Sequence, residues 1–525
     1  MSSRLARSAG LIGAATSVSR LLGLVREMVL AAIFGAGTQM DAFNVAFRIP
    51  NLLRDLFAEG AMTAAFVPTF TRTLTTHGRE AAWRLGNLVL NALVLVTAVL
   101  VIAGILFAPE ITGLLAPKFA EVDGKLELTT AMTRLMLPFL TMLAIAAAMM
   151  GMLNSLRRFF VPSLSPAMFN VASIFSALAL APLMPRVGLE PIVGLAIGTL
   201  LGGLGQIALQ WPALRREGFR YQPVISFRDP ALLEILRLMG PATLGLAAVQ
   251  INVAVNTFLA SGQQEGAVSW LQYAFRLMYL PIGIFGVSIA TASLPDISRQ
   301  AAAADLKAVR GSVSRGLRLM LMLNVPATVG LVVLAEPIVS MIYERRAFSP
   351  EDTAATALAL MFYAPGLIGY SAVKIASPTF YSMRDSRTPV LVSVGSVAVN
   401  LGLNLVLVRV MGYAGLALGT AVAALFNAGL LLWLLRRRLG TLDGRRLAVA
   451  LLKISVASAA MGASAYAAAA WLPGVLAFDG ALAKITTVFG AIGIALLVLA
   501  LAARTLRIEE FDEATARVLR RVRRR

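Results

Sequence analysis

Long apolar stretches follow one another along nearly the whole chain, and they constrain its fold more than any other feature. Hydrophobic residues make up 58% of the 525 residues and charged residues 14%. A globular protein of this length does not bury so much apolar surface, whereas a protein that crosses the bilayer many times does. We therefore expect an all-α integral membrane protein.

Fourteen stretches are long enough to cross a bilayer as helices. They are residues 8–35, 40–70, 86–108, 128–153, 160–184, 189–213, 232–260, 266–294, 312–341, 353–382, 388–410, 412–435, 447–472 and 481–504. The second stretch is the least hydrophobic. The first is too long for a cleavable signal, and Arg20 interrupts any signal-type apolar core.

Positive charge alternates between the connections. Arginine-rich connections, such as those with Arg157 and Arg158 or Arg215 and Arg216, alternate with connections that hold few or no basic residues. The positive-inside rule then places both termini in the cytoplasm. The net charge of +20 is distributed among these loops, so it does not predict a nucleic-acid partner.

The chain also repeats itself at an offset of about 221 to 228 residues. Gly194-Leu-Ala-Ile-Gly-Thr199 returns as Gly415-Leu-Ala-Leu-Gly-Thr420, and Ala46-Phe-Arg48 returns as Ala274-Phe-Arg276. A duplication of six spans keeps its orientation, so the two lobes should be related by an axis along the membrane normal. The glycines Gly194, Gly198 and Gly202 are interpreted as a helix-packing face.

The predicted organisation is therefore two pseudo-symmetric six-helix lobes, residues 1–216 and 229–440, followed by two additional helices within 444–504 and a basic cytoplasmic tail, 505–525. Apolar Leu506, Ile508 and Phe511 recur in the tail. This pattern is compatible with an interfacial helix. The favoured interpretation is a solvated basic tail that only anchors to lipid headgroups.

Arginines lie inside the apolar stretches. Arg20, Arg26, Arg48 and Arg54 belong to the first two, and Arg276 repeats Arg48 in the second half. A mid-membrane arginine costs roughly 2.5–3.5 kcal/mol on insertion scales, so such residues normally face a hydrated interior. A cluster of one sign predicts a ligand of the opposite sign, and arginine binds phosphate oxygens in a bidentate manner.

The alternative is that these arginines form structural ion pairs. Glu27, Asp41, Asp55 and Glu59 are the available carboxylates. This alternative explains Arg48 reasonably but leaves Arg20 and Arg276 without an obvious partner. Lys374, in the tenth stretch, is a further candidate point charge.

Other chemistry is sparse. The side-chain oxygens of Asn256, Asn400, Asn404 and Thr420 are candidate sodium ligands, although amides in membrane helices more often bond to neighbouring helices. The chain has no cysteine and only one histidine, His77. No phosphate-binding loop of the Gly-x-x-x-x-Gly-Lys-Ser/Thr type occurs, so we expect no cofactor and no ATP hydrolysis.

Several motifs resemble those of one family. They are Ser19-Arg-Leu-Leu-Gly-Leu-Val-Arg26, Phe34-Gly35, Asp41-Ala-Phe43, Pro50-Asn-Leu-Leu-Arg54, Phe57-Ala-Glu-Gly-Ala61, Ala65-Phe-Val-Pro68, Val268-Ser-Trp270, Arg276-Leu277, Phe380-Tyr-Ser382 and Thr388-Pro389. The sequence resembles the MurJ (MviN) family of bacterial lipid II flippases, in the multidrug/oligosaccharidyl-lipid/polysaccharide exporter superfamily. The likeness covers nearly all of the chain.

The resemblance implies a multi-pass protein of the bacterial cytoplasmic (inner) membrane. It implies that the two additional helices form a groove for the polyprenyl tail. By alternating access, the protein would carry lipid II, an undecaprenyl-pyrophosphate-linked disaccharide-pentapeptide, from the inner to the outer leaflet. Membrane lipids and proteins of cell-wall synthesis or division are its candidate partners.

The resemblance also implies a substrate-binding cavity. Its charged residues fall on Arg20, Arg26, Asp41, Arg54, Glu59 and Arg276, with Lys374 as an addition and Ser269 at a polar position. The family favours Arg54, whereas the internal symmetry favours Arg48, and we follow the family here. Sodium-binding members have carboxylates where this chain has Asn256, Asn400 and Asn404, which disfavours sodium coupling and leaves membrane potential or protons open.

Three rival functions remain. A flippase for another polyprenyl-pyrophosphate glycan would use the same arginines. A multidrug cation antiporter of the same superfamily should have an acidic cavity instead. A non-transporting membrane scaffold that recruits partners through its basic tail should fail when residues 505–525 are deleted, whereas a flippase should largely survive.

Overall fold

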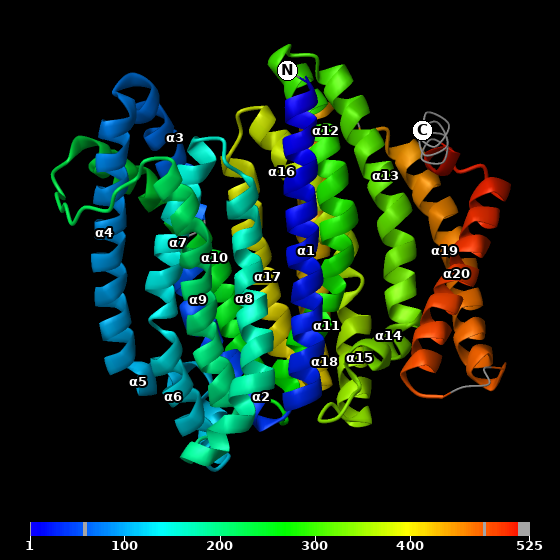
Figure 1. The fold of residues 1–525 in the computed structure, drawn as a ribbon. Coiled ribbons are helices and arrows are strands. Elements are labelled where there is room, and N and C mark those ends of the chain that lie inside the picture. The colour runs from blue at the N-terminus through cyan, green and yellow to red at the C-terminus, as the bar shows by residue number, and fades with distance from the viewer. Residues whose placement is uncertain (1, 56–59, 441, 476–478, 513–525) are drawn as a thin grey trace. The chain divides into compact units, whose positions relative to one another are not determined.

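The structure, a computed structural model, describes residues 2–55, 60–440, 442–475 and 479–512. These residues form helices joined by short connections, and no strand occurs among them. Figure 1 shows the helices as ribbons. The prediction of an all-α protein is confirmed.

The chain divides into two compact units. The first comprises residues up to Ser269 together with Arg345–Phe348, and the second comprises Trp270–Glu344 together with Ser349 onward. Packing thus joins α10 (Pro230–Ser261) to the first unit. The lobe boundaries inferred from the sequence repeat, 1–216 and 229–440, stay a prediction.

The other helices of the first unit follow in chain order: α1 (Ser2–Phe34), α2 (Thr38–Arg54), α3 (Gly60–Thr76), α4 (Gly78–Leu106), α5 (Ala108–Leu115), η2 (Pro117–Glu121), α6 (Lys125–Met136), α7 (Phe139–Ser155), α8 (Phe160–Phe175), η3 (Ser176–Leu180), η4 (Ala181–Val187) and α9 (Pro191–Arg216). Within this unit α1 packs along α8, and α10 packs along α3 (Figure 1).

The helix α11 (Ala267–Pro281) leads into the second unit. The remaining elements are η5 (Ile282–Gly286), α12 (Val287–Ala302), α13 (Leu306–Val333), α14 (Ala335–Tyr343), α15 (Pro350–Tyr363), α16 (Gly366–Ser382), α17 (Arg387–Met411), α18 (Tyr413–Leu439), α19 (Gly444–Val475) and α20 (Ala481–Thr505). Here α19 packs along α20 and α17 along α18.

Each predicted span falls on one or more of these helices. Among the described residues, nine helices are long and apolar enough to cross a membrane, or ten when the bent pair α15 and α16 counts as one span. The chain is therefore a multi-pass membrane protein. The count of fourteen spans stays a prediction.

Two prolines at equivalent places of the repeat divide a span in each unit. Pro138 precedes α7 and Pro365 precedes α16. Proline lacks an N–H and clashes with the preceding turn, which favours a break. At Pro365 the helices α15 and α16 bend by 42°.

The glycine repeat produces the same close packing in each unit. A Cβ on Gly198 would lie 2.4 Å from the Oγ of Ser176, and one on its repeat equivalent Gly419 would lie 2.0 Å from the Oδ1 of Asn404. Only glycine leaves room for these side chains without a shift. The interpretation of Gly198 as part of a packing face is confirmed.

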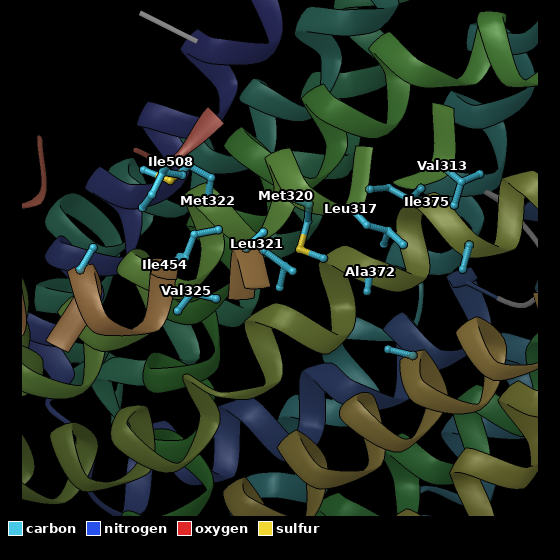
Figure 2. Packing of buried hydrophobic residues seen from close by; sticks show 14 of the residues in the cluster. Val313, Leu317, Met320, Leu321, Met322, Val325, Ala372, Ile375, Ile454 and Ile508 are labelled. Carbon is cyan, nitrogen blue, oxygen red and sulfur yellow. The ribbon is translucent and has the colours of Figure 1, made fainter. Parts of the chain in front are cut away.

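Each unit has its own apolar core. In the second unit, α13 supplies a row of buried side chains that packs against α12, α16 and α19. Figure 2 shows part of this core, with Met322, Val325 and Ile454 close to Ile508 of the tail. In the first unit, Phe66, Phe70 and Met152 belong to a core built from α3, α4 and α7.

The beginning of the tail belongs to the core of the second unit. Ile508 is 1% exposed and Glu510 is 5% exposed, while Phe511 packs against the same core. The interpretation of the tail as fully solvated is therefore wrong for this segment. Its hydrophobic residues bury against α13 and α19 rather than remain in water. The later arginines of the tail lie outside the described residues.

Candidate functional site

A buried carboxylate near the start of α2 collects four hydrogen bonds in the first unit. The Oδ1 of Asp41 accepts from the backbone N–H of Ser269 at 3.0 Å and from its hydroxyl at 2.7 Å. The Oδ2 accepts from the N–H of Gly266 at 2.8 Å and from the Nζ of Lys125 at 3.1 Å. Asp41 is 1% exposed, so the protein itself satisfies this charge.

These contacts bring together two predicted site residues that lie far apart in sequence. Asp41 and Ser269 belong to α2 and the first turn of α11. Asn44, one turn after Asp41, donates to the Ser269 hydroxyl at 3.1 Å. The first N–H groups of a helix have no partner within the helix, so the start of α11 attracts a carboxylate.

A second carboxylate lies in the connection before α11. Glu265 accepts hydrogen bonds from the N–H and the hydroxyl of Thr38, at 2.8 Å and 2.5 Å. The bond from the Thr38 hydroxyl is the main cause that lowers the pKa of Glu265 below its ordinary value. Glu265 thus satisfies an N–H at the start of α2 while Asp41 satisfies those of α11.

Arg26, on α1, is buried against an aromatic cluster. Its Nε donates to Glu27 at 3.1 Å, and its guanidinium carbon lies 5.1 Å from the centre of the Phe169 ring of α8. The Phe169 ring in turn stacks on Phe47 of α2, with centroids 5.7 Å apart. This arrangement supports the ion-pair alternative for Arg26 and adds a cation–π contact.

Arg54, at the end of α2, also pairs with the next residue. Its Nε and Nη2 lie 3.0 Å and 2.7 Å from the Oδ1 of Asp55, and Gln250 of α10 donates to the Oδ2 at 3.2 Å. Arg54 also lines a small cavity of about 50 Å³ whose other polar walls include Gln206 and Gln210. Its charge is therefore partly balanced, yet it faces a cavity.

Two predicted cations remain exposed in their spans. Arg20 lies on α1 and Lys374 on α16, and no ion pair to either is present among the described residues. Asn170 of α8 donates to the carbonyl of Ser19 at 3.0 Å and so fixes α1 beside Arg20. An exposed cation of this kind is available to a ligand.

The structure describes two of the three remaining predicted substrate residues. Arg48 of α2 and Arg276 of α11 are half-buried. Glu59 lies outside the described residues. Arg54 stays the predicted substrate residue of the second stretch, with Arg48 as the residue that the internal symmetry favours.

Three of the four sodium candidates have contacts within or between helices. Asn404 donates to the Oδ1 of Asn400 at 3.2 Å, and it packs against Gly419 of α18. Thr420 donates to the carbonyl of Leu416 within its own helix. In the described part of the chain no group of three or more His, Cys, Asp or Glu side chains converges on a possible metal position.

Sequence reasoning missed Lys125. Lys125 precedes the predicted span 128–153 and was not among the predicted site residues, yet its side chain is 3% exposed and lies over the Phe119 ring at 4.2 Å. No local signal distinguishes it, because its partner Asp41 lies 84 residues away. Its position in the first turn of α6, three residues before the predicted span 128–153, was the only available hint.

Comparisons with known proteins agree with the resemblance. The family model described as MurJ, lipid II flippase MurJ, matches residues 30–481. A probable lipid II flippase MurJ of Rhizobium meliloti is 38% identical over 88% of this chain and 86% of its own length. Another, from Vibrio cholerae, is 37% identical over 82% of this chain and 83% of its own length.

Solved structures give the same family and a wider fold group. The structure titled lipid II flippase MurJ, inward closed conformation, has a TM-score of 0.77 at 27% identity, over 94% of this chain and 99% of that chain. An inward-facing multidrug resistance MATE transporter has a TM-score of 0.66 at 15% identity, over 81% of this chain and 96% of that one. The second likeness shows the fold alone.

The family match spans most of the chain, and its relatives exceed 30% identity over most of their length. Arg48, Arg54, Arg276 and the Asp41–Ser269 contact lie within the matched region, whereas Arg20 and Arg26 precede it. The chain therefore belongs to the MurJ family of lipid II flippases, which are transporters rather than enzymes.

Proposed function

We propose that this protein moves lipid II from the inner to the outer leaflet of the bacterial cytoplasmic membrane by alternating access. Its cationic side chains would bind the pyrophosphate of the substrate, with both termini in the cytoplasm. The relatives that it matches are named lipid II flippases, which supports this choice of substrate.

One observation carries the assignment of the charges. Arg20 and Lys374 are exposed within predicted spans and lack ion pairs in the described chain, whereas the carboxylates Glu27, Asp41 and Asp55 are engaged within the protein. Positive charge therefore remains available after the internal pairs are counted. Such charge in a membrane is costly unless a hydrated cavity or an anionic ligand surrounds it.

The residues divide into two groups in this proposal. Arg20, Arg276 and Lys374 would contact the pyrophosphate, with Arg54 as the second-span contact. A pyrophosphate offers several oxygens, and each arginine can donate two parallel hydrogen bonds. Asp41 already accepts four hydrogen bonds, so we expect it to position the helices rather than to contact the substrate in this arrangement.

The test is binding of the purified full-length protein to lipid II, with bare undecaprenyl phosphate and a lipophilic cation as competitors. We expect Arg20→Ala and Lys374→Ala each to weaken lipid II binding by about tenfold to a hundredfold, because a hydrogen bond to a charged group contributes about 1.5–3 kcal/mol. Arg276→Ala should abolish flipping in proteoliposomes without loss of folded protein.

Arg215→Ala is the matched control, since this exposed arginine lies in the last turn of α9. It should leave lipid II binding unchanged. Preferential binding of the cation, or an active Arg276→Ala variant, would overturn the assignment of the charges. Equal binding of a polyprenyl-pyrophosphate carrying different sugars would favour another glycan as the substrate.

A further inference from the structure

A basic pocket lies in the second unit, where the tail returns against α13 and α19. Its volume is about 310 Å³, at the lower end of the range of ligand pockets. Five cationic side chains line it, namely Arg318, Arg445, Arg446, Lys453 and Arg507. None of these five was predicted to contact the substrate; Arg318 belongs to the second predicted lobe, and the other four to the two additional helices and the tail.

Positive charge exceeds negative charge in this pocket. The two carboxylates of its lining, Glu509 and Glu510, both pair with Arg318, the former at 3.3 Å. Among the described residues, Arg445 and Arg446 have no ion pair and are exposed. The Nζ of Lys453 donates to the carbonyl of Arg507, at 3.2 Å.

The tail holds the pocket in shape. Ile508 is 1% exposed and packs into the core formed by α13 and α19, and Figure 2 shows it beside Met322. Because Ile508 is anchored, Arg507 before it and Glu509 and Glu510 after it are held at the pocket. Arg318 is only 15% exposed at its side chain, and its Nε has no hydrogen-bond partner in the described chain.

An apolar track leads away from the pocket along α19. Val449 lines the pocket, and Leu452 and Val456 follow it on the same helix at spacings of three and four residues. These side chains are 47%, 66% and 52% exposed. Residues at this spacing share one face of a helix. A charged pocket that continues into an exposed apolar face matches a headgroup followed by an acyl chain.

We propose that this pocket binds the phosphodiester headgroup of an anionic glycerophospholipid, with an acyl chain along Val449, Leu452 and Val456. The pocket lies at the membrane face that the loop charges place in the cytoplasm, where anionic lipids attract basic residues with about 1 kcal/mol for each one. The exposed apolar residues that continue from the pocket favour a phospholipid over a soluble phosphate, which has no acyl chain to place on them.

The test is native mass spectrometry of the purified full-length protein titrated with phosphatidylglycerol, phosphatidylethanolamine or soluble glycerol 1-phosphate. We expect phosphatidylglycerol to bind saturably and more tightly than phosphatidylethanolamine or glycerol 1-phosphate. The double variant Arg445→Ala/Arg446→Ala should lose roughly tenfold to thirtyfold in affinity for phosphatidylglycerol. Glu509→Gln, which removes an exposed negative charge from the rim, should increase that affinity a few-fold.

Arg215→Ala/Arg216→Ala is the matched control, because these exposed arginines form the same kind of pair at the end of α9 in the first unit. An equal loss in both double variants would show that general charge, not this pocket, attracts the lipid. Displacement by glycerol 1-phosphate or by undecaprenyl pyrophosphate at equal concentration would overturn the phospholipid assignment. If the double variant unfolds without added lipid, an unchanged affinity in Glu509→Gln would decide against the pocket.

Discussion

The Nζ of Lys125 lies 3.1 Å from the Oδ2 of Asp41, and neither side chain is more than 3% exposed. The pair joins α6 to α2 within the first unit. Desolvation of two charges is costly, and their attraction compensates only while both partners and the surrounding hydrogen bonds remain. Removal of one partner should therefore be worse than removal of both.

Lys125→Met should destabilise the protein by about 3–5 kcal/mol, because it leaves the Asp41 carboxylate buried without its cation. Asp41→Asn combined with Lys125→Met should recover part of this loss. Denaturant unfolding of the purified variants in detergent, arranged as a double-mutant cycle, measures the coupling. Additive effects of the two substitutions would contradict a direct interaction between these residues.

The contact between Lys125 and Asp41 also shows which features of the structure could not be predicted from the sequence. Hydropathy predicted the helices and the glycine pattern predicted their close packing, because both are properties of one helix and its neighbours. The partner of Asp41 could not be predicted in this way, since Lys125 looks like a loop charge and pairs across 84 residues. The assignment of α10 to the first unit likewise depends on packing that no local pattern records.

The tail gives a second example. Ile508 and Phe511 were noticed as apolar residues in a basic segment, but their burial depends on the surface that α13 and α19 present. The location of Arg26 and Arg54 inside the membrane stays a prediction. Their pairing with the adjacent Glu27 and Asp55 was one of two alternatives, and only side-chain geometry could separate them.

Gly415→Ala should destabilise the second unit by about 1–3 kcal/mol, the typical cost of overpacking. The new Cβ would lie 2.3 Å from the carbonyl oxygen of Leu407, a backbone atom that cannot move aside alone. Gly395→Ala is the control within α17, because nothing lies within 4 Å of its Cβ. That variant should gain stability of about 0.5–1 kcal/mol. Thermal unfolding of both would reveal equal effects if the close approach were unimportant.

Transport should not depend on sodium. Asn400 and Asn404 bond to each other, and Asn404 packs against Gly419, so their amides are used in helix packing rather than arranged around a cation. Flipping measured in proteoliposomes should proceed at the same rate when potassium replaces sodium on both sides. A rate that falls several-fold in potassium, and is restored by sodium alone, would revive the sodium site.

Asp385, in the connection between α16 and α17, should make stability depend on acid pH. Its carboxylate accepts from the backbone N–H of Thr388 at 3.0 Å and from its hydroxyl at 2.7 Å, and it also pairs with Arg438. The backbone bond from Thr388 is the largest cause that lowers the pKa of Asp385 from 3.8 to about 2. The unfolded chain thus binds this proton at a higher pH than the folded protein does.

A carboxylate with a lowered folded-state pKa contributes stability that is complete above its unfolded pKa and is lost as the pH falls through its folded pKa. For Asp385 this window runs from 3.8 down to about 2. The difference in unfolding midpoint between the wild type and Asp385→Asn should be constant above pH ~5 and should shrink toward pH ~2. Thermal unfolding in detergent across this range measures it. A difference that persists unchanged at the acid end would mean that the amide loses something other than the negative charge, such as acceptor geometry at Thr388.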